Sequence, residues 1–180
     1  GQPNCTPGPD QGPEDGWLLG DDKQDPLRSL ANVLPGACLE YRVTVKNPSL
    51  VTIAADLSIA NNQCLCGFEL TDTMFDKDAF AFGPFDVRVS GECCSTMVPA
   101  FNWEGQPIIC LPPPQSFCPG DECVLTFKGR LKEDANIDQE PRNNVQVKGV
   151  VCPPGSPPRF GCHDNAQVAI DLERCGLSAE

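Results

Sequence analysis

Alternation of apolar and polar side chains is the clearest pattern in this chain. From Leu39 to Lys46 every second residue is apolar, and the residues between them are charged or polar. Because successive side chains of a β-strand point to opposite faces, this pattern predicts a strand with one buried and one solvated face. The Asn-Pro-Ser sequence at 47–49 is typical of a turn, and the apolar, β-branched run at 50–60 predicts the next strand.

The same alternation continues through the rest of the chain in shorter runs. Between Cys123 and Leu131 the apolar side chains fall on one predicted face and the charged ones on the other. Residues 25–34 come nearest to a helix, but their pattern is not convincingly amphipathic and Pro35-Gly36 ends it. We expect further strands at 68–71, 85–90, 107–111, 122–132, 145–151 and 166–172. Many short strands separated by Gly, Pro and Asn turns predict an all-β, two-sheet sandwich.

Cysteine makes up 12 of the 180 residues, an even number that suits full pairing. Such a content is typical of chains that fold in an oxidising compartment. A zinc site usually contains close Cys-x-x-Cys pairs, and none occurs in this sequence. We therefore predict a disulfide-rich fold, with these candidates: Cys5, Cys38, Cys64, Cys66, Cys93, Cys94, Cys110, Cys118, Cys123, Cys152, Cys162 and Cys175.

Two cysteine spacings carry more specific expectations. Cys93 and Cys94 are adjacent, so their side chains would point to opposite faces of a strand, and we expect them to bond to different partners. Cys64 and Cys66 are two residues apart, which would place them on one face of a strand. The remaining connectivity does not follow from spacing, because 12 cysteines allow too many pairings.

Charge and hydropathy narrow the classes of function. The chain has 13 basic and 25 acidic side chains and a net charge of −12, which repels nucleic acid and anionic membrane surfaces. No stretch approaches the ~20 apolar residues that cross a bilayer. The first ten residues also lack the basic and apolar regions of a signal peptide, so we interpret the chain as a processed, secreted protein at or outside a cell surface.

The N-terminal residues differ in composition from the rest. Residues 1–25 are rich in Pro, Gly and acidic side chains, and we interpret them as an extended arm that precedes a β-sandwich domain at 26–180. Within the arm, Trp17, Leu18 and Leu19 form a compact apolar cluster that would pack on the chain's own domain or on a neighbouring subunit. Cys5 could tie the arm to its own domain.

Several short motifs occur in an order that is similar to the order in a known protein family. Pro35-Gly36 precedes the strand that ends at Asn47, Thr71-Asp72-Thr73 follows, and Pro119-Gly120-Asp121 leads into a strand well before the Asn-Val-Gln-Val run at 144–147. This order resembles the bacterial surface-protein repeat called domain of unknown function eleven. The resemblance covers roughly residues 27–173. It implies an immunoglobulin-like sandwich used as a stalk, spacer or wall-associated module, without catalytic residues.

Few residues are candidates for catalysis, ligand binding or modification. His163 is the single histidine, and it sits in a Gly-Cys-His-Asp sequence without any nucleophile-elbow motif, so we interpret it as a surface residue and predict no catalytic site. Trp103 could be an exposed platform for sugar stacking, but we favour a core position. Asn4 begins an Asn-Cys-Thr sequence that fits the N-glycosylation pattern.

Acidic residues offer a weak alternative in the form of a calcium site. Asp72, Asp76 and Asp78 could supply hard oxygen ligands, as could the acidic residues between 21 and 25. Neither group follows the EF-hand loop with its central glycine. Solvated loop acids are the preferred interpretation, and we predict no cofactor or resident metal.

These patterns lead to one function and one alternative. We expect a non-enzymatic structural subunit of an extracellular or cell-surface assembly, such as a filament, stalk or layer, that associates through its arm with copies of itself or other surface proteins. The alternative is a cell-surface adhesion or carbohydrate-binding module. Stacking of Trp17 or Trp103 beside acidic side chains would favour the alternative.

Overall fold

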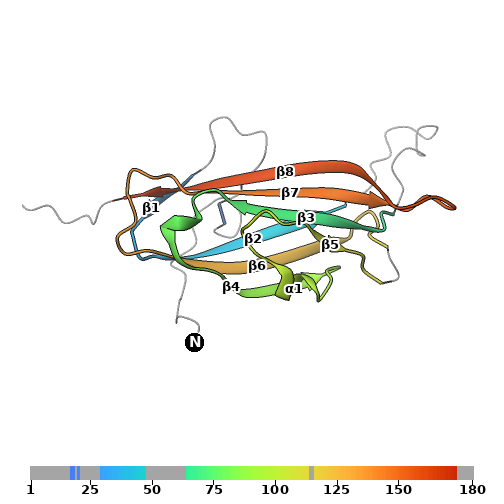
Figure 1. Cartoon of the computed structure of the whole chain (residues 1–180), viewed down its shortest axis with the longest axis horizontal. Coiled ribbons are helices and arrows are strands. Elements are labelled where there is room, and N and C mark those ends of the chain that lie inside the picture. The colour runs from blue at the N-terminus through green and yellow to red at the C-terminus, as the bar shows by residue number, and fades with distance from the viewer. Residues whose placement is uncertain (1–16, 19, 21–28, 48–63, 114–115, 174–180) are drawn as a thin grey trace, which may run out of the picture.

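Two β-sheets packed face to face form the chain (Figure 1). The computed structural model describes residues 17, 18, 20, 29–47, 64–113 and 116–173, apart from the side chain of Cys162. The strands are β1 Ser29–Val33, β2 Cys38–Lys46, β3 Gly67–Met74, β4 Phe80–Gly91, β5 Ile108–Cys110, β6 Glu122–Leu131, β7 Arg142–Val151 and β8 Arg159–Leu172. A 3-10 turn, η1 Lys77–Ala79, and a single helical turn, α1 Met97–Ala100, lie between strands.

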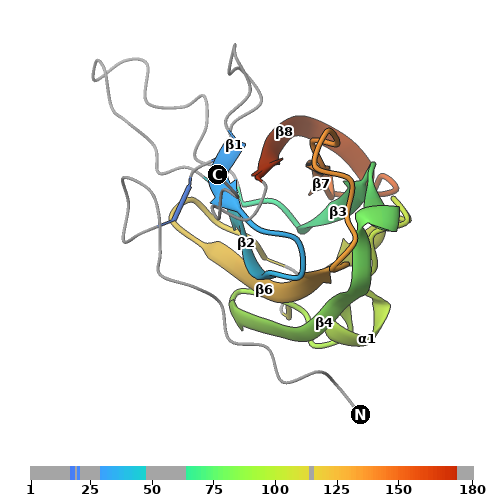
Figure 2. The ribbon, with the colours of Figure 1, turned by 90° about the vertical axis from the view of Figure 1, so that its left-hand side faces the viewer.

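The two sheets differ in width. The wider sheet has five strands in the order β1-β8-β7-β3-β5, and the narrower has three in the order β2-β6-β4 (Figure 2). β2 and β6 pair antiparallel without a register shift from Cys38 opposite Arg130 to Lys46 opposite Glu122. β1 pairs parallel with β8, through Ser29 opposite Ala169. The prediction of an all-β, disulfide-rich, two-sheet sandwich is confirmed.

Most predicted strands are present, and one strand was not predicted. The strand predicted at 39–46 is β2, and those predicted from residue 68 onward correspond to β3 to β8. The strand predicted at 50–60 lies outside the described residues. No strand was predicted within residues 25–34, where Ser29–Val33 forms β1. Its backbone is satisfied by pairing with β8, a contact between segments about 140 residues apart that local periodicity does not report.

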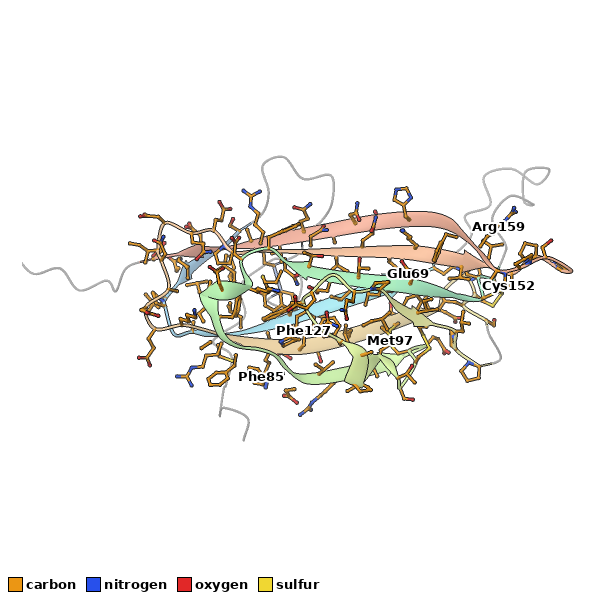
Figure 3. All side chains as sticks on the ribbon, viewed as in Figure 1. Glu69, Phe85, Met97, Phe127, Cys152 and Arg159 are labelled. Carbon is orange, nitrogen blue, oxygen red and sulfur yellow. A yellow bond between two sulfur atoms is a disulfide. The ribbon has the colours of Figure 1, made fainter. Side chains whose placement is uncertain are left out.

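The core lies between β6 and the inner face of the wider sheet. Cys123, Leu125, Phe127 and Leu131 of β6 are each no more than 1% exposed, which confirms the predicted inward face. The ring of Tyr41 stacks on Phe127 with 5.3 Å between centroids. The side chains of Phe127 and Met97 point into the space between the sheets (Figure 3). Tyr41 and Phe127 lie opposite each other on paired strands of the narrower sheet, so their stacking stabilises the β2–β6 pair.

One open side of the sandwich is closed by the segment between β4 and β5. α1 contacts both strands, which belong to different sheets, and Met97 and Phe101 within or next to it are buried. Trp103 follows and is 4% exposed, so its predicted core position is confirmed. The segment therefore acts as a plug between the edges of the two sheets on this side.

Trp103 depends on a glycine across from it. A Cβ added at Gly129 of β6 would lie 2.6 Å from the indole Cη2 and 2.9 Å from the Phe80 ring. These distances are shorter than any ordinary carbon contact, so a side chain at 129 would displace the indole. Glycine is required at this position by the close approach of the two rings.

Disulfides staple one end of the sandwich. This is the end where β3 and β6 begin and β4 and β7 finish, and Cys152 lies there (Figure 3). The four bonds with both partners described are Cys64–Cys118, Cys66–Cys152, Cys93–Cys123 and Cys94–Cys110. Cys38 is also disulfide-bonded, at the start of β2. Cys5, Cys175 and the side chain of Cys162 lie outside the described residues.

The two specific expectations about cysteines have different outcomes. Cys93 and Cys94 bond to different partners, as expected for adjacent residues. Cys64 and Cys66 do not share a strand face, because both precede β3, and Cys64 is exposed whereas Cys66 is buried. An isolated bridge between Leu65 and Phe117 holds that segment in place of a regular strand.

Complete reduction of the disulfides without denaturant should unfold or loosen the protein at moderate temperature. Each bond constrains the unfolded chain by about 2–4 kcal/mol, and the whole stability of such a domain is roughly 5–15 kcal/mol. Differential scanning calorimetry of reduced and alkylated protein checks this, with oxidised protein exposed to the alkylating reagent as the control. An unchanged melting curve, with the free thiols verified by mass, would contradict it.

Gly129→Ala should destabilise the fold by about 1–3 kcal/mol, because the added methyl meets the Trp103 indole in a packed core. The same substitution in a Trp103→Phe background should cost less, since the smaller ring lacks the indole atom that the methyl meets. Urea unfolding of the two single variants and the double variant measures this coupling. Strictly additive costs would show that the two residues do not constrain each other.

Candidate functional site

A groove runs along the side of the sandwich opposite the α1 plug. β2 is the last strand of the narrower sheet, and β1 pairs with β8 only from Ala169 onward. β2 of the narrower sheet and β8 of the wider sheet therefore lie on the same side of the sandwich, and both line one groove. The groove between them has a volume of about 510 Å³ and is lined by residues of β1, β2, β7 and β8.

The groove exposes residues that strand alternation assigns to the interior. On β2, Leu39 and Val45 are buried, yet Tyr41 and Val43 between them are half-buried and line the groove. On β7, Val145 and Val147 are half-buried in the same way. Facing residues Ala166 and Val168 of β8 complete an apolar surface. The inner faces of the two sheets are thus incompletely covered along this side.

The predicted contact residues of the arm lie at this groove. Trp17 and Leu18 line it and are half-buried, and Leu19 lies outside the described residues. The guanidinium of Arg42, on the outer face of β2, lies 4.5 Å from the centre of the Trp17 ring. Such a cation–π contact stabilises by about 0.5–1 kcal/mol at an exposed site. We call the apolar cluster at 17–19 the anchor of the arm. Its described residues, Trp17 and Leu18, contact the sandwich of their own chain.

Gly20 brings the same segment to the other sheet. A Cβ added at Gly20 would overlap the main-chain carbonyl of Gln167 on β8 and approach Val168. Glycine therefore permits the backbone of the arm to lie directly against the edge of β8. Because Trp17 meets β2 and Gly20 meets β8, the four-residue segment crosses the mouth of the groove from one sheet to the other.

A buried carboxyl group lies beside the groove. Asp72 of β3 is 2% exposed, and its Oδ2 accepts a hydrogen bond from Nδ2 of Asn143, which lines the groove, at 3.1 Å. Among the described residues, Oδ1 of Asp72 and Oδ1 of Asn143 have no hydrogen-bond partner. Burial raises the pKa of Asp72 to about 8, and the Asn143 bond lowers it by less. Asp72 is therefore mostly protonated at neutral pH.

Tyr41 shares this environment. Burial raises the pKa of its phenol, and the charge of Asp72 raises the pKa further. The phenol of Tyr41 is therefore neutral over the physiological range, and Asp72 is mostly neutral at pH 7. The interior beside the groove holds a set of neutral polar groups, and the absence of charge there is compatible with an apolar occupant.

The calcium alternative is not supported by the placement of Asp72, Asp76 and Asp78, and its other candidates, the acidic residues between 21 and 25, lie outside the described residues. Asp72 points into the core, which corrects its interpretation as a solvated loop acid. Asp76 and Asp78 lie near η1, where both accept hydrogen bonds from Nε2 of Gln139 at 3.3 and 3.4 Å. Across the part of the chain that the structure describes, no three Cys, His, Asp or Glu side chains gather as metal ligands.

The structure also shows the positions of His163 and Trp103, the two other residues that the sequence analysis considered for a functional role. His163 is exposed on β8, as interpreted from its surroundings in the sequence. Trp103 is buried by Tyr41, Phe80 and Phe127 and cannot stack on a sugar from solution. Within the described residues, no helix is long and apolar enough to cross a membrane.

Comparison with known proteins gave a structural likeness. No protein-family model matches the chain, and the search of curated proteins returned no match. Among solved structures, the chain is similar to the Actinomyces fimbrial adhesin FimA, with 18% sequence identity and a TM-score of 0.38. The likeness covers 81% of this chain and 51% of the other, so the chain spans about half the length of that adhesin.

Asp72→Asn should flatten the pH dependence of stability between pH 5 and 7. The folded pKa of Asp72, about 8, is above the unfolded value, so the contribution is complete below about pH 4 and is lost as pH rises through 8. Within that window the wild type should lose up to about 1.4 kcal/mol per pH unit relative to the variant. Urea unfolding at several pH values measures this.

The matched control for this measurement is Asp171→Asn, which changes an exposed carboxyl on β8. It should keep the wild-type dependence on pH. Equal slopes for wild type and Asp72→Asn would show that burial does not raise the folded pKa of Asp72 above this range.

Proposed function

We propose that this chain is a non-enzymatic structural subunit of an extracellular or cell-surface assembly, and that copies associate through the N-terminal arm. The observation that carries the proposal is the groove between β2 and β8, where the apolar anchor of the arm meets both sheets. Open strand edges and uncovered inner-face residues are features that natural sandwiches usually cover or pair. A subunit that presents both is suited to association with another chain.

The cysteines support a location outside the cell. All nine cysteines whose side chains the structure describes are disulfide-bonded. Disulfides at this density persist in oxidising compartments and are reduced in most cytosols. Staples at one end of the sandwich also suit a subunit that must persist in an unprotected environment.

The net charge sets a condition on assembly. At −12 per chain, copies repel one another at long range, and the repulsion is screened by salt with a Debye length of about 8 Å at physiological ionic strength. Self-association should therefore be weaker at low salt. Measurements of assembly belong at 0.15 M salt or above, as an order-of-magnitude guide.

The carbohydrate-binding alternative has lost its main support. It required Trp17 or Trp103 as a stacking platform beside acidic side chains. Trp103 is in the core, and Trp17 stacks on the Arg42 cation. The structural role is the better interpretation of the same residues.

Deletion of residues 1–22 should leave a folded monomer that no longer associates. The sandwich from β1 onward retains its core, whereas the deletion removes the apolar anchor at 17–19 and Gly20. Sedimentation velocity and negative-stain electron microscopy of the full chain and the truncated chain measure assembly, and calorimetry checks folding. A full-length chain that stays monomeric at high concentration in physiological salt would overturn the proposed function.

A second variant removes a complication of the deletion, which also eliminates Cys5. Joint substitution Trp17→Ser, Leu18→Ser and Leu19→Ser keeps every cysteine and removes only the apolar anchor. It should abolish association to the same extent as the deletion. Asn4→Ala, elsewhere in the arm, is the matched control and should assemble as the wild type does.

A further inference from the structure

We propose that the groove between β2 and β8 is the acceptor for residues 17–20 of a second copy, so that subunits exchange arms. This inference rests on the proposed function and names the surface through which it operates. The occupant is a segment of the same sequence, and the acceptor is formed by both sheets of the receiving subunit. Three features of the structure support this assignment.

The first feature is that the groove already fits this segment. Arg42 on one wall stacks on the Trp17 ring, and the edge of β8 on the other wall lies so close to Gly20 that no side chain is possible there. Leu18, between them, lines the groove. A large ring, an aliphatic residue and a glycine are thus each matched to a different part of one site.

The second feature is that the chain's own segment leaves the site incomplete. Trp17 and Leu18 remain half-buried, and about 510 Å³ of the groove is unfilled with both in place. Tyr41 and Val43 on one wall also remain half-buried. A second sandwich brought to this side by its own arm would cover these residues, whereas the arm of a single chain leaves them accessible to water.

The third feature is the length of the connection between the arm and the sandwich. Gly20 lies against Gln167, and Ser29 pairs with Ala169, so both ends of the connection at 21–28 meet β8 two residues apart. Two residues along a strand correspond to roughly 7 Å. Eight residues can span roughly 26–29 Å. The connection is therefore far longer than attachment to its own groove requires, and it can reach the groove of a neighbour.

Exchange of an identical segment makes two arrangements possible. The contacts of the segment are the same in its own groove and in a neighbour's, so exchange costs little beyond the loss of independent motion. Reciprocal exchange between two copies closes a two-fold dimer. Exchange in one direction leaves a free arm at one end and a free groove at the other, and it propagates head to tail.

A mixing experiment tests the acceptor directly. The donor-lacking variant is the chain without residues 1–22, which keeps its groove. The acceptor-blocked variant is Ala166→Trp, which fills the groove and keeps its arm; Val43→Lys is a second block on the opposite wall. Each variant alone should be monomeric, and an equimolar mixture should form a one-to-one heterodimer by native mass spectrometry and light scattering.

The outcomes separate the inference from the proposed function. If the wild type assembles and both acceptor-blocked variants assemble equally well, the groove is not the acceptor, although the subunit function stands. Monomers in the mixture, from variants that each melt like the wild type, would also overturn the inference. If the wild type itself does not assemble, the proposed function fails first.

A surface substitution tests the same site if the blocking variants fail to fold. Arg42→Ala in the chain without residues 1–22, which has no arm of its own to compete, removes the cation under Trp17 and should weaken the binding of this chain to the wild-type arm by about two- to fivefold. Lys46→Ala, which removes a cation from the same outward face of β2 but outside the groove lining, is its matched control and should have no effect. Equal affinities for the two variants in sedimentation equilibrium would count against the groove as acceptor.

Discussion

Among the described residues a three-stranded sheet packs against a five-stranded sheet, and these three strands do not cover the whole apolar face of the wider sheet. Strands in a sheet are spaced by about 4.8 Å, so the sheets are roughly 14 and 24 Å wide. The chain covers part of the difference on the β4 and β5 side, where the segment with α1 and Trp103 lies between the edges. On the β2 and β8 side the difference remains as the groove.

Polar residues are also buried in the interior beside the groove. Asp72 follows Phe68 and Leu70 on the inward face of β3, where a carboxylate would be destabilised by loss of water. The group remains there because it binds a proton and accepts the amide of Asn143. Its neighbour Tyr41 is neutral for the same reason. A fully covered core would more usually have an apolar residue at position 72.

The parts of this structure that the sequence could predict are those governed by local alternation. β2 and β6 follow from it because each has one apolar and one polar face, and the same alternation at Phe68, Leu70 and Asp72 was the unused signal for a buried carboxyl. β1 could not be predicted, because its partner β8 is distant in sequence. The groove could not be predicted either, since it arises from the number and order of strands in each sheet.

The positions of the disulfides explain how an apolar groove can remain open. Sheets that face each other across an uncovered gap tend to slide or close to bury their apolar residues. In this chain Cys94–Cys110 joins the end of β5 to the segment after β4, and Cys93–Cys123 joins that segment to β6. These bonds link the two sheets on the side away from the groove and limit such movement. A receptor held in shape before its partner arrives loses less conformational freedom on binding, which favours association through this surface.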